Sequence, residues 1–197
     1  TVKAGEKAGT ATITGLPVGV YVEKITEQTK SGWTMKSLTP GTLTLAENAE
    51  SNQITVTNSY SASGTWTPKA TKKLDAGGRT LKDKEFSFVV KDQAGNTVMT
   101  GTNNANNNAN NNVTFVTTDE KKTNSISYTA PGTYTYTIEE VTPADGEKET
   151  NMSYSDAVYT VTVTVTDPNK DGNLNVDAVY VSSKESGNKT SAEFVNT

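Results

Sequence analysis

Ala157-Val-Tyr-Thr-Val-Thr-Val-Thr-Val-Thr-Asp167 is the stretch of sequence that decides the fold of this chain. Apolar and polar residues alternate along it, and residues two apart in a strand share one face. The stretch therefore predicts a β-strand with one buried and one solvent-facing side. Only 32% of the 197 residues are hydrophobic, yet Thr, Val and Tyr recur in the same alternation elsewhere, which favours strands with one wet face over disorder.

Shorter runs of the same kind are spaced along the whole chain. We expect strands near 9–15, 19–27, 42–46, 53–58, 66–74, 85–91, 97–102, 112–118, 125–129, 132–141, 157–167, 174–183 and 191–197. No segment shows a convincing helical pattern. The sequence therefore predicts an all-β protein built from immunoglobulin-like β-sandwich domains in tandem.

A small, polar, Gly- and Ser-containing stretch at 58–65 divides the chain. We predict a first domain at 1–60, a linker at 61–65 and a second domain at 66–197. The first domain is short for a sandwich and has no counterpart of the strand that opens the second. We therefore expect residues 1–60 to be the C-terminal part of a domain whose first strands lie upstream.

Composition excludes several classes of function. The chain has no Cys and no His, which excludes disulfides, thiolate metal sites, Cys nucleophiles and the commonest general base. Its formal net charge is −4, which argues against nucleic acid as a partner. No apolar run is long enough to span a membrane. No cofactor and no metal are predicted.

Three polar residues stand where a strand should point its apolar face inward: Lys72, Glu140 and Asn196. Their neighbours two residues away are apolar: Ala70 and Leu74, then Ile138, then Phe194. One amine, one carboxyl and one carboxamide are thus aimed at a β-core. A buried Lys and Glu must pair or become neutral, because an unpaired buried charge is very costly.

This set of groups is the one needed for an amide cross-link that releases ammonia. A low-dielectric pocket favours the neutral forms of an amine and of a carboxylic acid. Neutral Lys72 would attack the side-chain carbonyl of Asn196. Protonated Glu140 would polarise that carbonyl and carry protons to the departing ammonia. The reaction would happen once per molecule and is not enzymatic turnover.

Each of the three residues has a competing interpretation. A slip of one residue in strand register would point Lys73 or Lys69 inward in place of Lys72, and Glu139 in place of Glu140. Strand parity favours Lys72 and Glu140. Asn196 could be a plain turn residue, but Phe194 on the same face weakens that interpretation.

Residues 1–60 repeat part of the pattern. Gly19–Glu27 parallels Gly132–Glu140, and Ile54–Asn58 parallels Ala192–Asn196. Glu27 and Asn58 therefore form a second, incomplete site that lacks its lysine. Lys3 and Lys7 are the only lysines before the turn at Gly15, and we expect them on a middle strand. We predict no internal cross-link in this segment.

Four motifs carry a family resemblance: Ala70-Thr-Lys-Lys-Leu74, Arg79-Thr-Leu-Lys-Asp-Lys-Glu-Phe-Ser-Phe88, Tyr134-Thr-Tyr-Thr-Ile-Glu-Glu140 and Glu193-Phe-Val-Asn196. With them, residues 66–197 resemble the streptococcal pilin isopeptide-linkage domains of Gram-positive pilins and surface adhesins. The resemblance implies that the first strand supplies a Lys, the last an Asn and a central strand a catalytic Glu or Asp. By position these are Lys72, Asn196 and Glu140.

The first domain has a resemblance of its own. Leu16-Pro-Val-Gly19 and Val56-Thr-Asn58 make residues 1–60 similar to the tail of a collagen-adhesin B-repeat or pilin-type domain. Together the resemblances imply an extracellular, cell-wall-anchored structural stalk or shaft module of a Gram-positive pilus or adhesin. Its partners would be neighbouring domains or pilus subunits, and a host or glycan ligand could bind elsewhere in the full protein.

Two rival functions are weaker on the sequence. A ligand- or carbohydrate-binding adhesin module could use Trp33 and Trp66 to stack on sugars, although single tryptophans near strand ends more often cover a core. Asp167-Pro-Asn-Lys-Asp-Gly172 resembles the start of a calcium loop, but Ala178 replaces the bidentate Glu. A hairpin turn is the favoured interpretation of that segment.

Overall fold

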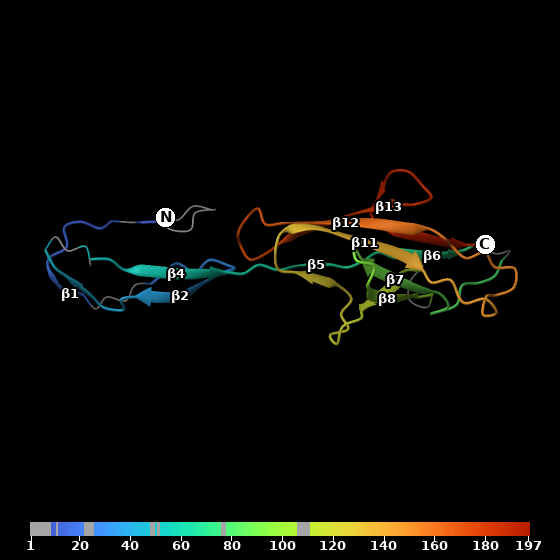
Figure 1. Ribbon diagram of the computed structural model, residues 1–197, viewed down its shortest axis with the longest axis horizontal. Helices are drawn as coiled ribbons and strands as arrows, with labels where there is room; N and C mark the ends of the chain where they lie inside the picture. The colour runs from blue at the N-terminus through green and yellow to red at the C-terminus, as the bar shows by residue number, and fades with distance from the viewer. Residues whose placement is uncertain are drawn as a thin grey trace. The chain divides into compact units, whose positions relative to one another are not determined.

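The computed structural model describes residues 9–10, 12–21, 26–47, 50, 52–75, 78–105 and 111–197. Within these residues every helix or strand assigned is a β-strand (Figure 1), which confirms the all-β class. The chain divides into two compact units. One runs up to Ala62 and includes residues 167–173, and the other consists of residues 63–166 and 174–197.

The second unit is a β-sandwich. Its strands are β5 (Gly64–Trp66), β6 (Ala70–Leu74), β7 (Ser87–Asp92), β8 (Thr97–Asn103), β9 (Val113–Thr117), β10 (Ile126–Tyr128), β11 (Gly132–Glu140), β12 (Val158–Thr166), β13 (Asn175–Ser182), β14 (Asn188–Lys189) and β15 (Ala192–Asn196). An antiparallel sheet runs in the order β14-β13-β12-β11-β7-β8-β9. β6 and β15, the strands near the two ends of this unit, pair in parallel.

The core of this unit lies between the large sheet and the β6–β15 pair. Phe194 of β15 contacts the rings of Phe88 on β7 and Tyr159 on β12, at centroid distances of 5.2 and 5.4 Å. All three side chains are buried. Along β12 the valines face this core and the threonines face outward, as the alternation in the sequence predicts. β11 and β12 run side by side in the sheet (Figure 1).

The sequence predicts a single strand at 66–74, but the structure has two separate strands there, β5 and β6. Pro68 lies between them, and a proline cannot donate to a β-ladder. The chain therefore changes partner at this point. β5 pairs with β10, whereas β6 pairs with β15. The two-residue strand β14 was also not expected.

The first unit contains two antiparallel strand pairs among its described residues. β1 (Gly19–Tyr21) pairs with β3 (Leu43–Leu45), and β2 (Trp33–Thr39) pairs with β4 (Thr55–Tyr60). The expected strand at 9–15 is wrong for residues 9–10 and 12–15, which have no regular structure. Of the expected strand at 19–27, only β1 is a strand, residues 26–27 are irregular, and 22–25 lie outside the described residues.

The sequence pattern does not predict β2, and the structure shows the reason. Its register against β4 shifts between Met35 and Ser37, and such a bulge breaks the period-two alternation that marks a strand. The pair is closed at one end by Trp33, which lies opposite Tyr60 with ring centroids 4.9 Å apart. Tyr60 also donates a hydrogen bond to Asp167 Oδ2 at 2.9 Å.

The first unit has little interior of its own. Among its described residues before Ala62, none is buried. Large apolar side chains are exposed there, including Ile13, Leu16, Val18, Met35 and Val56. A sheet whose apolar side chains face water needs further structure to cover it.

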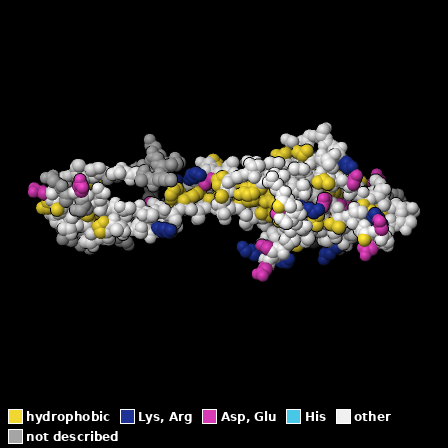
Figure 2. Space-filling model, in the orientation of Figure 1, with side chains coloured by type: hydrophobic (Ala, Val, Ile, Leu, Met, Phe, Trp, Pro, Cys, Tyr) yellow, Lys and Arg dark blue, Asp and Glu magenta, His cyan; other side chains and the backbone are white. Residues whose placement is uncertain are grey.

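Two surface properties bear on function. Within the described part of the chain, no helix has the length and apolar character needed to cross a membrane. On the face drawn in Figure 2, basic and acidic side chains are interspersed and do not gather by sign. Among the described residues on this face, no basic patch of the kind that binds nucleic acid is seen.

Candidate cross-linking site

The structure buries the three polar residues that strand parity points inward. Lys72 and Asn196 have no solvent exposure, and Glu140 is 6% exposed. They come from three strands, β6, β15 and β11. The burial of alternate residues along each strand follows the predicted pattern, because one face of each strand lies against the core.

Glu140 bridges the other two residues. Lys72 Nζ lies 2.6 Å from Glu140 Oε2. Asn196 Nδ2 donates a hydrogen bond to Glu140 Oε1 at 2.8 Å. The amine and the carboxamide are therefore held on the two oxygens of one carboxyl group, inside the protein.

The competing residues lie on the outer faces and have other partners. Lys73 pairs with Glu193 at 2.6 Å on the solvent side of the β6–β15 pair. Glu139 pairs with Lys91 on the other face of the large sheet. Lys69 is exposed. The register slip that would point any of these residues inward is therefore wrong.

The surroundings of Lys72 disfavour its charge. Its Nζ lies 4.5 Å from the centroid of the Phe86 ring. Burial lowers the pKa of Lys72 below its ordinary value, and the hydrogen bond to Glu140 opposes that shift without cancelling it. A lowered pKa means that the Lys72 amine gives up its proton more readily than an exposed lysine does, and the Glu140 oxygen lies 2.6 Å away.

The orientation of the Asn196 carboxamide is fixed by the backbone of Ser155. The Ser155 N–H donates to Asn196 Oδ1 at 2.8 Å. A backbone N–H can only donate, so the carboxamide oxygen must face it and the NH₂ group must face Glu140. Strand parity and the chemistry of the three groups predict that Glu140 polarises the carbonyl and carries protons to the departing nitrogen. In the structure Glu140 contacts the nitrogen instead, and Ser155 contacts the oxygen.

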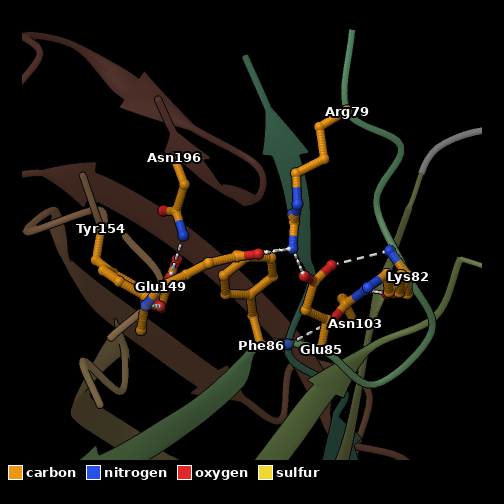
Figure 3. A network of polar contacts seen from close by, with 9 residues as sticks. Arg79, Lys82, Glu85, Phe86, Asn103, Glu149, Tyr154 and Asn196 are labelled. Atoms are coloured by element: carbon orange, nitrogen blue, oxygen red, sulfur yellow. Dashed lines mark hydrogen bonds and ion pairs between the residues drawn. The ribbon is translucent and has the colours of Figure 1, made fainter. Parts of the chain in front are cut away.

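A second polar network lies beside this site. Arg79 reaches between Glu85 and Glu149 (Figure 3), and Glu85 is followed in the chain by Phe86, whose ring lies beside Lys72 Nζ. The Glu149 N–H donates to the hydroxyl of Tyr154 at 3.1 Å. The hydrogen bond with Glu85 is the main cause that raises the pKa of Arg79. This network ties the connection between β6 and β7 to the connection between β11 and β12.

Sequence reasoning missed Ser155, Tyr154 and the arginine network. Ser155 acts through its backbone, which has no signature in a sequence. Arg79 lies within a motif that the family resemblance quoted, but its partner Glu149 belongs to a connection without periodicity. Only the folded chain brings them together.

The first unit contains a contact of the same kind. Asn58 Nδ2 donates to Glu27 Oε1 at 2.6 Å. Asn58 Oδ1 is buried and has no hydrogen-bond partner among the residues that the structure describes. Lys3 and Lys7 lie outside the described residues. The carboxyl–carboxamide half of the arrangement is therefore present among the described residues of this unit.

A family model described as FctA, the Spy0128-like isopeptide-containing domain, matches residues 68–197, about two thirds of the chain. The chain belongs to the FctA family. Its similarity to streptococcal pilin isopeptide domains is thus established for this region, and membership of the FctA family supports a structural role in a pilus. No curated protein matches the chain.

Solved structures of Streptococcus pyogenes pilins are also similar to the chain. The major pilin matches with 18% identity and a TM-score of 0.37, over 68% of this chain and 50% of the pilin. The T-13 major pilin matches with 16% identity and a TM-score of 0.37, over 68% of this chain and 53% of the pilin. The chain spans about half the length of the pilins that it matches.

Proposed function

We propose that residues 66–197 form an intramolecular isopeptide bond between Lys72 and Asn196, with Glu140 as the proton carrier, and serve as a structural stalk module. The observation that carries this proposal is the buried Glu140 carboxyl, which holds Lys72 Nζ and Asn196 Nδ2 on its two oxygens. The amine and the carboxamide are the two reactants of an amide exchange, and the acid between them is its proton carrier.

Folding supplies the proximity that the reaction needs. Holding two reacting groups in place can contribute roughly 7–11 kcal/mol toward such a barrier. The lowered pKa of Lys72 makes the neutral, nucleophilic amine accessible. Glu140 contacts both the attacking nitrogen and the departing one, so a single carboxyl can move protons between them.

The position of the bond suits a load-bearing role. β6 and β15 are neighbouring parallel strands near the start and the end of the unit. Tension that enters before β6 and leaves after β15 would shear this pair, and a Lys72–Asn196 bond would carry that tension directly. The bond would also close a loop of 124 residues (196 − 72). By analogy with disulfide loop entropy, such a closure is worth about 5 kcal/mol of stability.

This chemistry fits a protein that works outside the cell. An amide resists reduction and needs no Cys, and the chain has none. We therefore place the module in an extracellular, cell-wall-anchored pilus or adhesin. Its partners would be the neighbouring domains of the same polypeptide and adjacent pilus subunits. It is a structural protein that reacts once with itself, and not an enzyme that turns over a substrate.

Mass spectrometry tests the proposal directly. The intact mass of the folded chain should fall short of the sequence mass by one ammonia. Tandem spectra should join the peptide that contains Lys72 to the one that contains Asn196. Lys72→Ala should restore the full mass, and its matched control Lys73→Ala, on the exposed face, should still lose ammonia. A folded chain with its full sequence mass would contradict the proposal.

The alternative function, a ligand- or carbohydrate-binding adhesin module, has less support. Trp66 is 5% exposed and therefore cannot stack on a sugar. Trp33 is 41% exposed, but its ring packs on Tyr60. A glycan array probed with the whole chain separates the two functions, because a structural stalk should bind none of the glycans.

We further propose that Glu27 and Asn58 are two members of a second cross-linking site that awaits its lysine. Their 2.6 Å contact matches the 2.8 Å contact between Glu140 and Asn196. The absence of buried residues among the described ones before Ala62 is what a sandwich without its opening strands would show. Residues 1–60 would then be the C-terminal part of a related B-repeat or pilin-type domain.

A further inference from the structure

Among the described residues, the carboxamide of Asn196 forms hydrogen bonds with Glu140 and with the backbone of Ser155. Glu140 contacts the nitrogen that leaves as ammonia. The Ser155 N–H contacts the oxygen at 2.8 Å. When an amine attacks a carboxamide, the carbonyl oxygen gains negative charge, and a fixed donor at that oxygen stabilises the transition state.

We propose that the backbone N–H of Ser155 is the oxyanion donor of the Lys72–Asn196 reaction. The inference rests on the proposed function above and adds a catalytic group to it. A bond forms between Lys72 Nζ and Asn196 Cγ while the carbonyl electron pair moves to Oδ1, where Ser155 donates. Glu140 then gives its proton to Nδ2 and takes one from Nζ. The Cγ–Nδ2 bond breaks, so that one amine and one carboxamide yield one secondary amide and one ammonia.

The segment that carries Ser155 is held in place independently of the reacting groups. Ser153 and Thr197 exchange two backbone hydrogen bonds, at 2.6 and 3.1 Å. These bonds tie the segment 153–155 to the residue that follows Asn196. The donor and the carbonyl that it serves are therefore aligned by the same short stretch of backbone pairing.

A second set of contacts holds the side chain of Tyr154, the residue before Ser155. The ring of Tyr154 packs edge-on against Phe86 at a centroid distance of 6.0 Å. The Tyr154 hydroxyl accepts a hydrogen bond from the Glu149 N–H, and Glu149 pairs with Arg79 (Figure 3). Phe86 is also the ring beside Lys72 Nζ. The donor is thus fixed before the reaction, which is the condition for a large electrostatic effect.

The test removes one hydrogen-bond donor, the N–H of residue 155, from the backbone. Full-length chains are made by cell-free translation with either Ala or lactic acid at position 155. Lactic acid is the α-hydroxy analogue of alanine, so the two chains differ only in a backbone N–H or O. Translation is stopped, and the loss of ammonia is followed over time by intact mass. The lactic acid chain should link about 100-fold more slowly than the Ser155→Ala chain, which keeps the backbone N–H and is the reference.

Three results separate the possible failures. Equal rates for the lactic acid and Ser155→Ala chains would overturn the role of Ser155 while leaving the proposed function intact. No ammonia loss from the unaltered chain would overturn both. Folding is checked on the same two chains combined with Lys72→Met, so that neither can link, by comparing their resistance to protease. If the Ser155 N–H were important only for folding, the lactic acid chain would lose protease resistance as well as linking rate.

A measurement on the unaltered chain does not depend on folding of a variant. In the linked product the new amide keeps its carbonyl oxygen, so Ser155 should still donate to it. We expect slow hydrogen exchange at the Ser155 N–H and a through-hydrogen-bond NMR coupling to the side-chain carbonyl carbon of residue 196. Exchange at the rate of an unprotected amide, with no coupling, would overturn the inference.

Discussion

Phe194 of β15 lies directly opposite Lys72 of β6 in the parallel register of the two strands. Phe194 packs against Phe88 and Tyr159, so the lysine stem runs beside an aromatic cluster and the amine ends near Phe86. Water is excluded from the amine, and the carboxyl group in contact with it is that of Glu140. The lowered pKa of Lys72 follows from this position.

The first prediction concerns pH and the unlinked chain. In Asn196→Ala the cross-link cannot form, and Lys72 stays a titratable amine. Because its folded pKa is lowered, the unfolded chain binds more protons than the folded chain in the interval below about 10.4. The free energy of unfolding of Asn196→Ala should therefore rise with pH through the alkaline part of that interval.

The matched control is the double variant Lys72→Met, Asn196→Ala, compared by chemical denaturation at several pH values. Tyr128 and Tyr136 have raised pKa values and are present in both variants, so their contribution cancels in the difference. An identical pH dependence of the two variants would contradict the assignment of a lowered pKa to Lys72.

The second prediction separates the two neighbouring glutamates. Glu140→Gln keeps the size of the side chain but removes the acid that carries protons, so the chain should fold and stay unlinked. Its melting temperature should fall by on the order of 10 °C, because about 5 kcal/mol of loop-closure stabilisation is lost. Glu139→Gln changes a partly exposed residue that pairs with Lys91 on the other face. It should link as the unaltered chain does.

Intact mass and calorimetry on the two variants provide the measurement. Linking in Glu140→Gln at the unaltered rate, or its loss in Glu139→Gln, would show that the proton carrier is not the buried residue. Glu139 and Glu140 are adjacent residues of β11 that face opposite sides of the sheet, which makes Glu139→Gln a stringent control.

The third prediction is mechanical. Force applied to the two ends of the chain should reach β6 and β15 and pass through the Lys72–Asn196 bond. The 124 residues inside that loop cannot then extend. In Lys72→Ala the same residues should be released and lengthen the chain by about 400 Å, at roughly 3.3 Å per residue.

Single-molecule force spectroscopy measures this length directly. Lys73→Ala is the matched control, because Lys73 lies on the exposed face of the same strand. A release of about 400 Å from the unaltered chain would mean that no covalent bond joins β6 to β15.

Strand parity predicted which side chains are buried at the site, for a clear physical reason. Lys72, Glu140 and Asn196 each lie on a strand whose apolar neighbours fix the inward face. A period of two leaves only two choices of face, and the outward choice would bury Lys73 or Glu139 in their place. The alternation of apolar and polar residues along each strand is therefore enough to predict which side chains of the site are buried.

Other features could not be predicted because they do not depend on alternation. The Ser155 donor belongs to the backbone, and its position depends on the pairing of Ser153 with Thr197. β2 is hidden by the bulge between Met35 and Ser37. The direction in which the Asn196 carboxamide points depends on that same backbone donor, so strand parity alone could not show that Glu140 contacts the carboxamide nitrogen and not its oxygen.

The last prediction concerns Glu27 and Asn58. Their hydrogen bond places a carboxyl on a carboxamide nitrogen, as at Glu140 and Asn196, and Asn58 Oδ1 has no partner within the described part of the chain. In the chain as given, only one ammonia should be lost, and residues 1–60 should exchange their amides faster than residues 66–197, because none of the described residues before Ala62 is buried.

A longer chain that carries an upstream lysine strand should lose a second ammonia and join that lysine to Asn58. Asn58→Ala in the longer chain should abolish only this second loss, and Asn196→Ala only the first, because the two sites lie in separate units. If another molecule supplies the strand instead, the chain as given should associate in a concentration-dependent way by strand addition. Equal amide protection of residues 1–60 and 66–197 in a monomer would contradict both forms of the prediction. A unit whose backbone amides are already protected has no unpaired strand edge to which a further strand could add.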